Sequence, residues 1–542
     1  MLQDEPRFQA DNETVLGYAP GSAERSALQA ELRRQYGQQA EIPLVIGGQR
    51  IHSAVRTELV CPHEHGHVLA RLSQAGSLEA QAAVVAASKA QQDWASSSLA
   101  ERSAVFLKAA DLLAGPWRQR LNAATMLGQS KNMQQAEIDS ACELIDFLRF
   151  NVQFAQELSA QQPISSPGVR NRLEYRPLEG FVYAITPFNF TAIGGNLATA
   201  PVLMGNSVVW KPSATAAWSN YLFMELLEEA GLPAGVINFL PGNSGQISQT
   251  LLADRRLAGI HFTGSTAVFD QLWQQTAQHL AHYRSYPRLV GETGGKDFVL
   301  AHPSADVDAL AVALLRGAFE YQGQKCSAAS RAYIPASLWP ALKERLLDLV
   351  PSIKMGNPAE ADTFMGAVID QRAFTRITRA VAAAHSDSGA RVITQGAPDA
   401  RVGWFVPPTI IEVEAPQHSL MCEELFGPVL AVHVYADVDW NKTLQLVDET
   451  SPYALTGAVF ARERAAIAEA GAVLRFAAGN FYINDKPTGA VVGQQPFGGA
   501  RRSGTNDKAG SALNLLRWVS PRTVKETHLP ARDYRYPHMQ LD

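Results

Sequence analysis

Short β-rich runs alternate with helical stretches through the middle of the chain. The β-rich runs are 181–185, 207–210, 236–240, 259–262 and 288–290, and the helical stretches are 191–204, 216–230, 244–252 and 267–279. Apolar strands of this length between helices predict βαβ units and a parallel sheet. A sheet built this way binds ligands at the carboxyl ends of its strands.

A second α/β pattern begins after Gly294. Residues 298–300 and 332–334 are predicted strands, 307–321 and 338–350 are predicted helices, and the same style continues to about residue 484. A chain of 542 residues exceeds one hydrophobic core, so two or three domains are expected. The tail, 513–519 and 522–527, has β character, and we expect it to close a sheet edge, preferably on a neighbouring chain.

Two helical features precede the first sheet. Residues 26–36 are predicted to form a helical arm, and residues 76–160 are mainly helical. Ser98 and Glu101 have the spacing of a capping box, which predicts a helix that Gly115-Pro116 ends.

Composition excludes several function classes. The net charge of −5 without a basic cluster disfavours nucleic-acid binding, and no apolar run approaches the roughly 20 residues of a membrane helix. The four cysteines fit neither a disulfide framework nor a zinc site, and the 13 histidines are scattered, so we expect no metal and a reducing compartment. The first residues resemble neither a secretory signal nor a transit peptide.

Cys326 is the leading candidate for chemistry. It lies in the polar stretch Gln322-Gly323-Gln324-Lys325-Cys326-Ser327, directly after a predicted helix. A cysteine in polar surroundings is expected to be partly exposed and easily ionised, as a nucleophile requires. Taken alone, a structural cysteine is the commoner case.

Two further clusters carry groups suited to acid–base or oxyanion chemistry. Glu292 precedes Thr293-Gly294-Gly295, where a carboxylate beside a flexible bend can act as a general base, although a surface glutamate in a linker would look the same. Asn189 follows the strand 181–185 and can donate to an oxyanion, although an Asx turn or helix cap is the commoner use.

Three clusters suit a dinucleotide. Gly264 and Ser265 follow a predicted strand and open a helix, whose N-terminus can hold a phosphate, but the usual glycine-rich pattern is absent. Lys211 ends another strand, where it can bind a ribose hydroxyl or a phosphate, or simply be a solvated lysine. Glu423 and Glu424 can bind sugar hydroxyls, or form a charged loop before the strand 429–434.

Together these motifs resemble the aldehyde dehydrogenase superfamily, over residues 46 to 527. The resemblance implies that Cys326 attacks the aldehyde, Glu292 activates water, and Asn189 binds the oxyanion together with the backbone N–H of Cys326. It also implies a set of NAD-binding residues, which comprises Lys211, Ser213, Gly264, Ser265, Glu424 and Phe426.

The resemblance implies an α/β fold with three parts. A Rossmann-like, NAD-binding domain is expected at 1–165 and 186–291, a second, catalytic α/β domain at 292–500, and a small β oligomerisation extension at 166–185 and 501–542. A homodimer or higher homo-oligomer is therefore expected. The compartment would be the cytoplasm in a bacterium or the mitochondrial matrix in a eukaryote.

Within the superfamily, the chain resembles the L-glutamate γ-semialdehyde dehydrogenases. This resemblance rests on four features: Phe269, the threonine after Glu292, the segment 143–147, and the loop 488–499. It implies oxidation of L-glutamate γ-semialdehyde to glutamate, the second step of proline catabolism. The implied substrate-binding residues are Glu143, Phe190, Ser327, Gly489, Ala490 and Phe497.

Each implied substrate contact has a chemical reason. Backbone N–H groups at Gly489 and Ala490 can hold the α-carboxylate, and Ser327 adds a hydroxyl. Phe190 and Phe497 can clasp the aliphatic middle of the substrate. Glu143 can lie near the ammonium group, at the end remote from the aldehyde.

Three alternatives remain open. Ala214 stands where many NAD-specific relatives have an acid that repels a 2′-phosphate, so NAD is expected and NADP is a weaker alternative. The substrate can instead be another acidic or aliphatic aldehyde. A catalytically idle structural or binding relative would be expected to lack the cysteine or the glutamate, and both are present.

Overall fold

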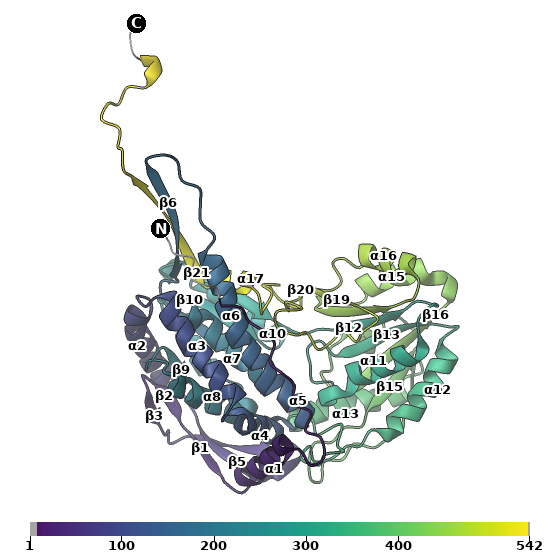
Figure 1. The fold of residues 1–542 in the computed structure, drawn as a ribbon. Coiled ribbons are helices and arrows are strands. Elements are labelled where there is room, and N and C mark those ends of the chain that lie inside the picture. Colours follow the sequence, from purple (N-terminus) through teal and green to yellow (C-terminus); the bar gives the residue numbers. More distant parts are fainter. Residues whose placement is uncertain (1–7, 540–542) are drawn as a thin grey trace.

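The computed structural model describes residues 8–539. Figure 1 shows two α/β bodies side by side, with a two-stranded ribbon extending from one of them. The first body contains a seven-stranded sheet of order β11-β10-β7-β8-β9-β2-β3. Its strands are β11 (Arg288–Glu292), β10 (Leu257–Thr263), β7 (Phe181–Ile185), β8 (Ser207–Lys211), β9 (Ile237–Phe239), β2 (Leu44–Ile46) and β3 (Gln49–Ile51). The five strands from β11 to β9 are parallel, as the sequence predicts.

Helices cover both faces of this sheet because alternate strand residues point to opposite sides. Val182 and Ala184 of β7 pack with α7 (Thr191–Leu203) and α8 (Ala217–Ala230), and with α3 (Leu99–Ala114) and α6 (Leu144–Ser159) behind them. Phe181 and Tyr183 face α2 (Ser77–Trp94), α9 (Ser244–Leu252) and α10 (Thr266–Gln278). The predicted capping box of α3 is confirmed, since Ser98 and Glu101 bond each other's backbone N–H.

The second body contains another seven-stranded sheet, of order β14-β15-β16-β13-β12-β18-β19. Its strands are β14 (Ala390–Val392), β15 (Thr409–Val413), β16 (Val429–Tyr435), β13 (Ala329–Pro335), β12 (Asp297–Ala301), β18 (Thr456–Phe460) and β19 (Asn480–Ile483). One face packs on α11 (Val307–Phe319) and α12 (Trp339–Leu349). The other face packs on α13 (Gln371–Ser386), α15 (Trp440–Glu449) and α16 (Arg464–Val473).

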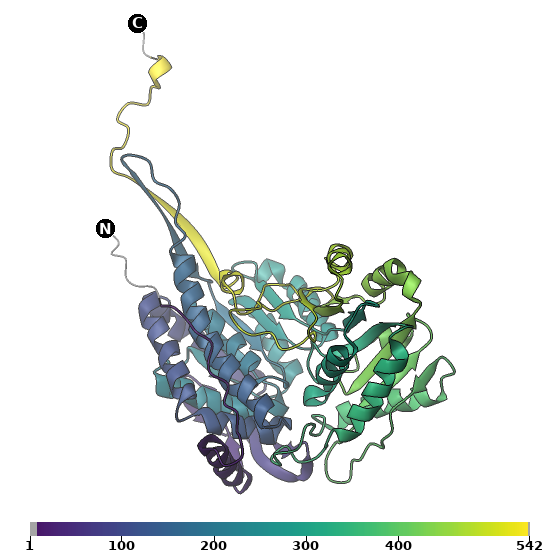
Figure 2. The same cartoon turned by 45° about the vertical axis from the view of Figure 1, so that its right-hand side comes forward.

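An antiparallel ribbon of two strands that are far apart in the sequence, β6 (Val169–Pro177) and β21 (Val519–Thr527), projects from the first body (Figures 1 and 2). Two boundaries differ from the sequence prediction. Residues 181–185 lie inside the first sheet as β7, not in the extension. Residues 512–516 form the helix α17 (Ala512–Leu516) instead of a strand, because Ser511 caps its N-terminus and Leu515 is buried.

The N-terminal region forms α1 (Ala23–Tyr36), within which the predicted arm helix lies, and a small sheet of β1 (Ala40–Ile42), β5 (Glu64–Ser73) and β4 (Arg56–Cys61). The turn between β4 and β5 reaches the second body: the backbone N–H of Trp404 donates to the carbonyl of Pro62 at 3.0 Å. This contact helps to fix the two bodies relative to each other.

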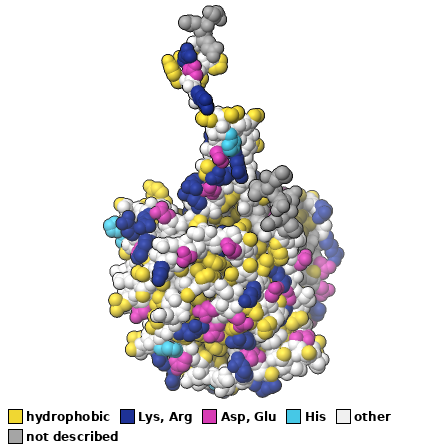
Figure 3. Space-filling model, turned by 60° about the vertical axis from the view of Figure 1, so that its left-hand side comes forward, with side chains coloured by type: hydrophobic (Ala, Val, Ile, Leu, Met, Phe, Trp, Pro, Cys, Tyr) yellow, Lys and Arg dark blue, Asp and Glu magenta, His cyan; other side chains and the backbone are white. Residues whose placement is uncertain are grey.

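Acidic and basic side chains are interspersed over the face in Figure 3, with no large area of one sign. Among residues 8–539, no helix is both long and apolar enough to cross a membrane.

Candidate active site

The predicted nucleophile follows a left-handed turn at the end of α11. Tyr321, Gln322 and Gly323 all have positive φ angles, of 51°, 55° and 65°. A Cβ atom at Gly323 would lie 2.3 Å from the carbonyl oxygen of Gly427, so only glycine fits there. The buried amide of Gln322 stabilises the turn through bonds to the carbonyls of Ser130 and Ala367. This turn directs the following loop, with Cys326, toward the first body.

Cys326 is partly exposed, as predicted, but its thiol is not easily ionised. Burial and the nearby carboxylates of Glu292, Asp297 and Glu424 raise its pKa well above the usual value. Lys325 does not offset this effect, because its ammonium bonds Glu320 at 3.0 Å. The expectation of a readily formed thiolate is therefore wrong in this structure, and the thiol needs a base.

Glu292 is the last residue of β11, at the carboxyl edge of the first sheet. Burial raises its pKa to about 8, against the lowering effect of Lys508. Its effect on the pKa of Cys326 shows that the two side chains lie near each other. A half-buried carboxyl with a pKa near neutrality has the properties of a general base.

Asn189 is buried and its side-chain amide donates to the carbonyl of Gln324 at 3.0 Å. Because an amide has two N–H groups, one remains for a further acceptor. Asn189 does not cap α7, which excludes the commoner use of asparagine. The cap is supplied by the carboxylate of Asp139, which accepts from the N–H groups of Thr191 and Ala192 at 3.1 and 3.0 Å.

Glu424 joins the start of the second body to the nucleophile loop. Its carboxylate accepts from the N–H of Gly295 at 2.9 Å, and burial raises its pKa to about 7. Glu424, Phe426 and Cys326 line one small cavity. Phe426 packs edge-to-face on Phe188, with ring centroids 5.7 Å apart. The structure thus brings two predicted cofactor residues beside the predicted nucleophile.

The other predicted cofactor residues lie at the carboxyl edge of the first sheet. Lys211 ends β8, and burial lowers its pKa to about 8. Within residues 8–539 no carboxylate forms a salt bridge with it. Ser213 follows two residues later, and its hydroxyl lies 3.2 Å from that of Thr215. Gly264 and Ser265 join β10 to α10, where Ser265 is the N-cap. An exposed helix start and a lysine without a salt bridge, at the same edge of the sheet, suit an anionic, hydroxyl-bearing ligand.

Residues 488–497 of the predicted substrate loop, 488–499, lie against the nucleophile loop. The hydroxyl of Ser327 is 2.8 Å from that of Thr488. Gly489 has a φ of 96°, which favours glycine, and it is exposed, while Ala490 is half-buried. Phe497 bonds the backbone of Ala509 in both directions, at 3.0 and 2.8 Å.

Glu143 and Phe190 lie near a buried ion pair, Lys131 with Asp139, that the sequence analysis did not select. The ammonium of Lys131 bonds Asp139 at 2.6 Å and lies 4.1 Å from the centre of the Phe190 ring. It also lies 4.4 Å from the centre of the Tyr321 ring. Burial and Asp139 raise the pKa of Glu143 to about 8.

Glu143 ends a π-helix, η1 (Glu137–Glu143), which continues into α6. Such widened turns often occur at functional sites. No local signal could have indicated Lys131, because the two rings that its ammonium contacts, Phe190 and Tyr321, lie far along the chain.

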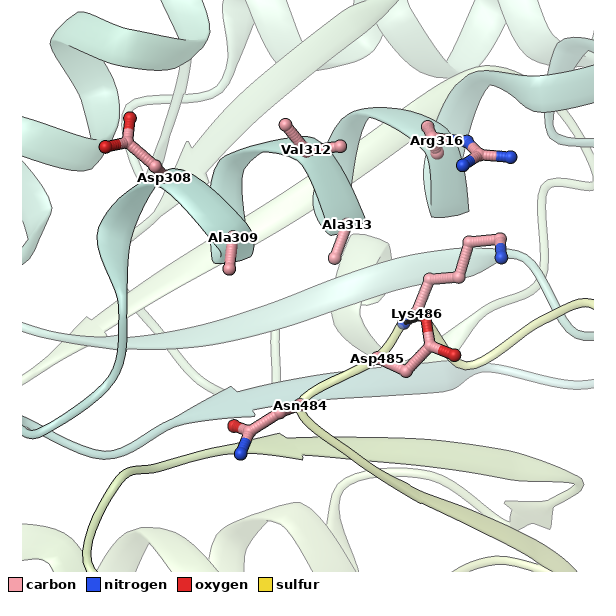
Figure 4. A pocket seen from close by; sticks show the side chains of 8 residues that line it. All are labelled: Asp308, Ala309, Val312, Ala313, Arg316, Asn484, Asp485 and Lys486. Atoms are coloured by element: carbon pink, nitrogen blue, oxygen red, sulfur yellow. Dashed lines mark hydrogen bonds between the residues drawn. The ribbon is translucent and has the colours of Figure 1, made fainter.

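A separate hollow of about 420 Å³ lies between α11 and the segment after β19 (Figure 4). Asp308, Arg316, Asp485 and Lys486 contribute its charges, and Val312 contributes an apolar side. None of the predicted site residues lines it, so the candidate active site remains the region around Cys326.

Comparisons with known proteins agree with this geometry. The model of the Aldehyde dehydrogenase family matches residues 51–524. The mitochondrial delta-1-pyrroline-5-carboxylate dehydrogenases of Bos taurus and Homo sapiens are 52% and 51% identical to the chain. Each alignment covers 98% of this chain, with 95% of the bovine and 94% of the human protein.

Solved structures give the same result. The delta-pyrroline-5-carboxylate dehydrogenase of Mycobacterium tuberculosis, solved with NAD bound, is 55% identical, has a TM-score of 0.95, and is matched over 98% of both chains. A 1-pyrroline-5-carboxylate dehydrogenase from Thermus with bound NAD is 31% identical with a TM-score of 0.90, over 96% of this chain and 100% of that one. The family model and these relatives match most of the chain, and the fold is the same. The chain therefore belongs to the aldehyde dehydrogenase family.

Proposed function

We propose that this chain oxidises L-glutamate γ-semialdehyde, the open form of 1-pyrroline-5-carboxylate, to L-glutamate with NAD as oxidant. The observation that carries this proposal is the contact between Ser327, beside the nucleophile, and Thr488, which precedes Gly489 and Ala490. The contact places the segment that carries Gly489 and Ala490 against the residue that follows Cys326. The dehydrogenase names of the relatives support the same reaction.

The residues at the first sheet edge fit NAD. Lys211 and Ser213 suit the adenosine ribose, Gly264 and Ser265 suit the pyrophosphate, and Glu424 suits the nicotinamide ribose. NAD, when bound, supplies the hydride acceptor.

The reaction begins at Cys326. A proton must leave the thiol before attack, and Glu292 accepts it, since among the nearby carboxylates Glu292 has the largest effect on the pKa of Cys326. The thiolate then adds to the aldehyde carbon, and the carbonyl oxygen becomes an oxyanion. Asn189 and the N–H of Cys326 stabilise that oxyanion.

Loss of hydride from the adduct leaves a thioester on Cys326. Glu292, after releasing its proton to solvent, takes a proton from water, and the resulting hydroxide attacks the thioester carbon. The C–S bond breaks, glutamate leaves, and the sulfur regains a proton. The same pair of residues therefore serves both halves of the reaction.

The far end of the substrate is held by its two charges. The α-carboxylate binds the N–H groups of Gly489 and Ala490 and the hydroxyl of Ser327. Glu143 faces the ammonium group, and Phe190 and Phe497 enclose the methylene groups between the two ends.

Assembly and location complete the proposal. The projecting ribbon of β6 and β21 supports a homodimer or higher homo-oligomer, with 166–177 and 501–542 as the oligomerisation extension. The NAD-binding and catalytic domains correspond to the two sheets. The compartment is the bacterial cytoplasm or the mitochondrial matrix, according to the source.

A substrate panel tests the proposal. Purified enzyme with NAD⁺ is supplied with 1-pyrroline-5-carboxylate, succinate semialdehyde or hexanal, and NADH formation is followed. The highest kcat/KM is expected for 1-pyrroline-5-carboxylate, because only that substrate carries both head-group charges. A higher value for either competitor would overturn the substrate assignment and favour another acidic or aliphatic aldehyde. No turnover with any aldehyde would favour an idle relative.

A further inference from the structure

The segment before α1, residues 8–18, is held against helices without forming a helix or strand of its own. Figure 2 shows this purple segment running along the blue helices of the first body. Four of its backbone N–H groups donate to side chains of η1 and α6: Phe8 to Gln156, Ala10 to Gln153, Glu13 to Asp146 and Leu16 to Glu137, at 2.7–2.9 Å. Because buried backbone donors need partners, these bonds fix the course of the arm.

Asn12 is the point where the arm contacts the predicted substrate loop. Its amide donates to the carbonyl of Val492 at 2.7 Å and to the carboxylate of Asp146 at 2.8 Å. Its side-chain oxygen accepts from the amide of Gln494 at 2.9 Å. One half-buried side chain thus joins the arm, the helix α6 and the loop 488–497.

The loop is otherwise held to α6 by apolar packing alone. Val492 is buried in the core cluster that includes α6. Gly493 has a φ of 83°, and a Cβ atom there would lie 2.4 Å from the ring of Phe150. Packing of this kind limits the height of the loop over the helix but does not fix a position along it, whereas hydrogen bonds are directional.

The position of the loop along α6 matters because the helix also presents Glu143. Glu143 lies three residues before Asp146, so the two side chains are neighbours on one helical face. Asn12 therefore connects the loop that contains Gly489 and Ala490 to the helical segment that contains Glu143. A substrate whose carboxylate and ammonium share one carbon requires these two sites at a fixed separation.

We propose that Asn12 is a positioning residue that sets the separation between the carboxylate-binding loop and Glu143, and so confers selectivity for the amino-acid head group. This inference rests on the proposed function. Asn12 touches neither substrate nor cofactor, and it acts through Val492, Gln494 and Asp146. Aldehydes without the head group do not use the separation that it sets.

Steady-state kinetics of the full-length enzyme test this inference. Asn12→Ala is compared with Gln494→Ala, which removes only one loop contact, and with Asp11→Ala, an exposed neighbour in the same arm. Each variant is supplied with 1-pyrroline-5-carboxylate and, separately, with propanal, and NAD⁺ binding is measured by calorimetry.

Asn12→Ala is expected to raise KM for 1-pyrroline-5-carboxylate about tenfold, the effect of losing one or two net hydrogen bonds. Gln494→Ala should give a smaller rise, and Asp11→Ala none. For propanal, kcat/KM should stay within about twofold of wild type, as should NAD⁺ affinity. A merely structural role would lower both substrates' kcat/KM equally, and that result would overturn the inference.

The outcomes separate this inference from the proposed function. If wild-type enzyme does not turn over 1-pyrroline-5-carboxylate, the proposed function fails. If wild type does so and both variants keep its KM, only the role of Asn12 fails. Should Asn12→Ala not fold, Gln494→Ala decides: a selective rise in KM for 1-pyrroline-5-carboxylate supports the positioning role, and an unchanged KM contradicts it.

Discussion

At the level of single residues, the site contains carboxyl groups that are weaker acids than usual. Burial raises the pKa values of Glu292 and Glu424 to about 8 and 7. Burial, and the charges of these two groups and of Asp297, raise the pKa of the Cys326 thiol well above its usual value. A protonated thiol is protected from oxidation between turnovers, since the thiolate is the reactive form. In the proposed mechanism Glu292 is therefore the proton acceptor.

The pKa of Glu292 predicts a pH dependence. Glu292 acts as a base only when ionised, and with a pKa of about 8 it is mostly protonated at pH 6. The steady-state rate of thioester hydrolysis should therefore rise nearly tenfold per pH unit up to pH 7 and level off above pH 8. Measurement of kcat from pH 6 to 9 checks this, with Glu292→Gln as the control that should lose the rise. A flat wild-type profile would exclude the base role.

Asn189 should contribute to the rate and not to cofactor binding. Asn189→Ala is expected to lower kcat by ~10²–10³, the usual effect of removing one oxyanion donor. NAD⁺ affinity should be unchanged. Asn151→Ala is a matched control, because Asn151 is also buried and bonds a neighbouring amide, that of Asn196. Comparable losses in the two variants would mean that Asn189 matters only for folding.

At the level of helices and strands, the sequence predicted the regular elements well. The strands β7 to β11 and the helices α7 to α10 lie within two residues of their expected bounds at most ends, since apolar runs and turn residues are local signals. The sequence did not predict η1, the left-handed turn at 321–323, or α17. These depend on contacts between distant segments, such as Gln322 with Ser130 and Ala367, that local patterns do not contain.

The same division applies to the site. Cys326, Glu292 and Asn189 stand in recognisable motifs. Lys131 and Asn12 instead contact residues far along the chain, such as Phe190 and Val492. Residues of the second kind have no neighbouring signal in the sequence.

The left-handed turn gives a prediction at this level. Gly323→Ala should destabilise the fold by more than about 2 kcal/mol, because alanine is strained at φ of 65° and its Cβ would meet the Gly427 carbonyl. Gly471→Ala is the control: a Cβ there meets nothing within 4 Å, and alanine in the helix α16 should stabilise by about 0.5–1 kcal/mol. Urea unfolding monitored by fluorescence measures both. Equal stability of the two variants would contradict this account.

At the level of the whole molecule, the ribbon of β6 and β21 is a sheet that has no further strand on either edge among residues 8–539. β6 and β21 pair only with each other among residues 8–539, and a two-stranded sheet alone is marginally stable. Ile164 and Leu529, which adjoin the ribbon strands in the sequence, are 93% and 80% exposed. Exposed strand edges and apolar side chains are the features on which the proposed homo-oligomer rests.

Truncation tests whether the ribbon of β6 and β21 mediates oligomerisation. A chain that ends at Trp518 lacks β21 and should sediment as a monomer. A chain that ends at Thr527 keeps both strands of the ribbon and should sediment as the full-length protein does. Analytical ultracentrifugation of all three chains checks this. A shortened chain of unchanged assembly size would show that other surfaces mediate association.

The central claim is that Cys326 carries a glutamyl thioester that Glu292 hydrolyses. The most direct measurement is rapid mixing of Glu292→Gln with NAD⁺ and 1-pyrroline-5-carboxylate at high pH, where the thiol can ionise without its acceptor, followed by mass spectrometry of the quenched protein. The account predicts a burst of about one NADH per active site, slow turnover afterwards, and a glutamyl adduct on Cys326 that Cys326→Ala lacks. Loss of the burst, or an adduct on another residue, would contradict it.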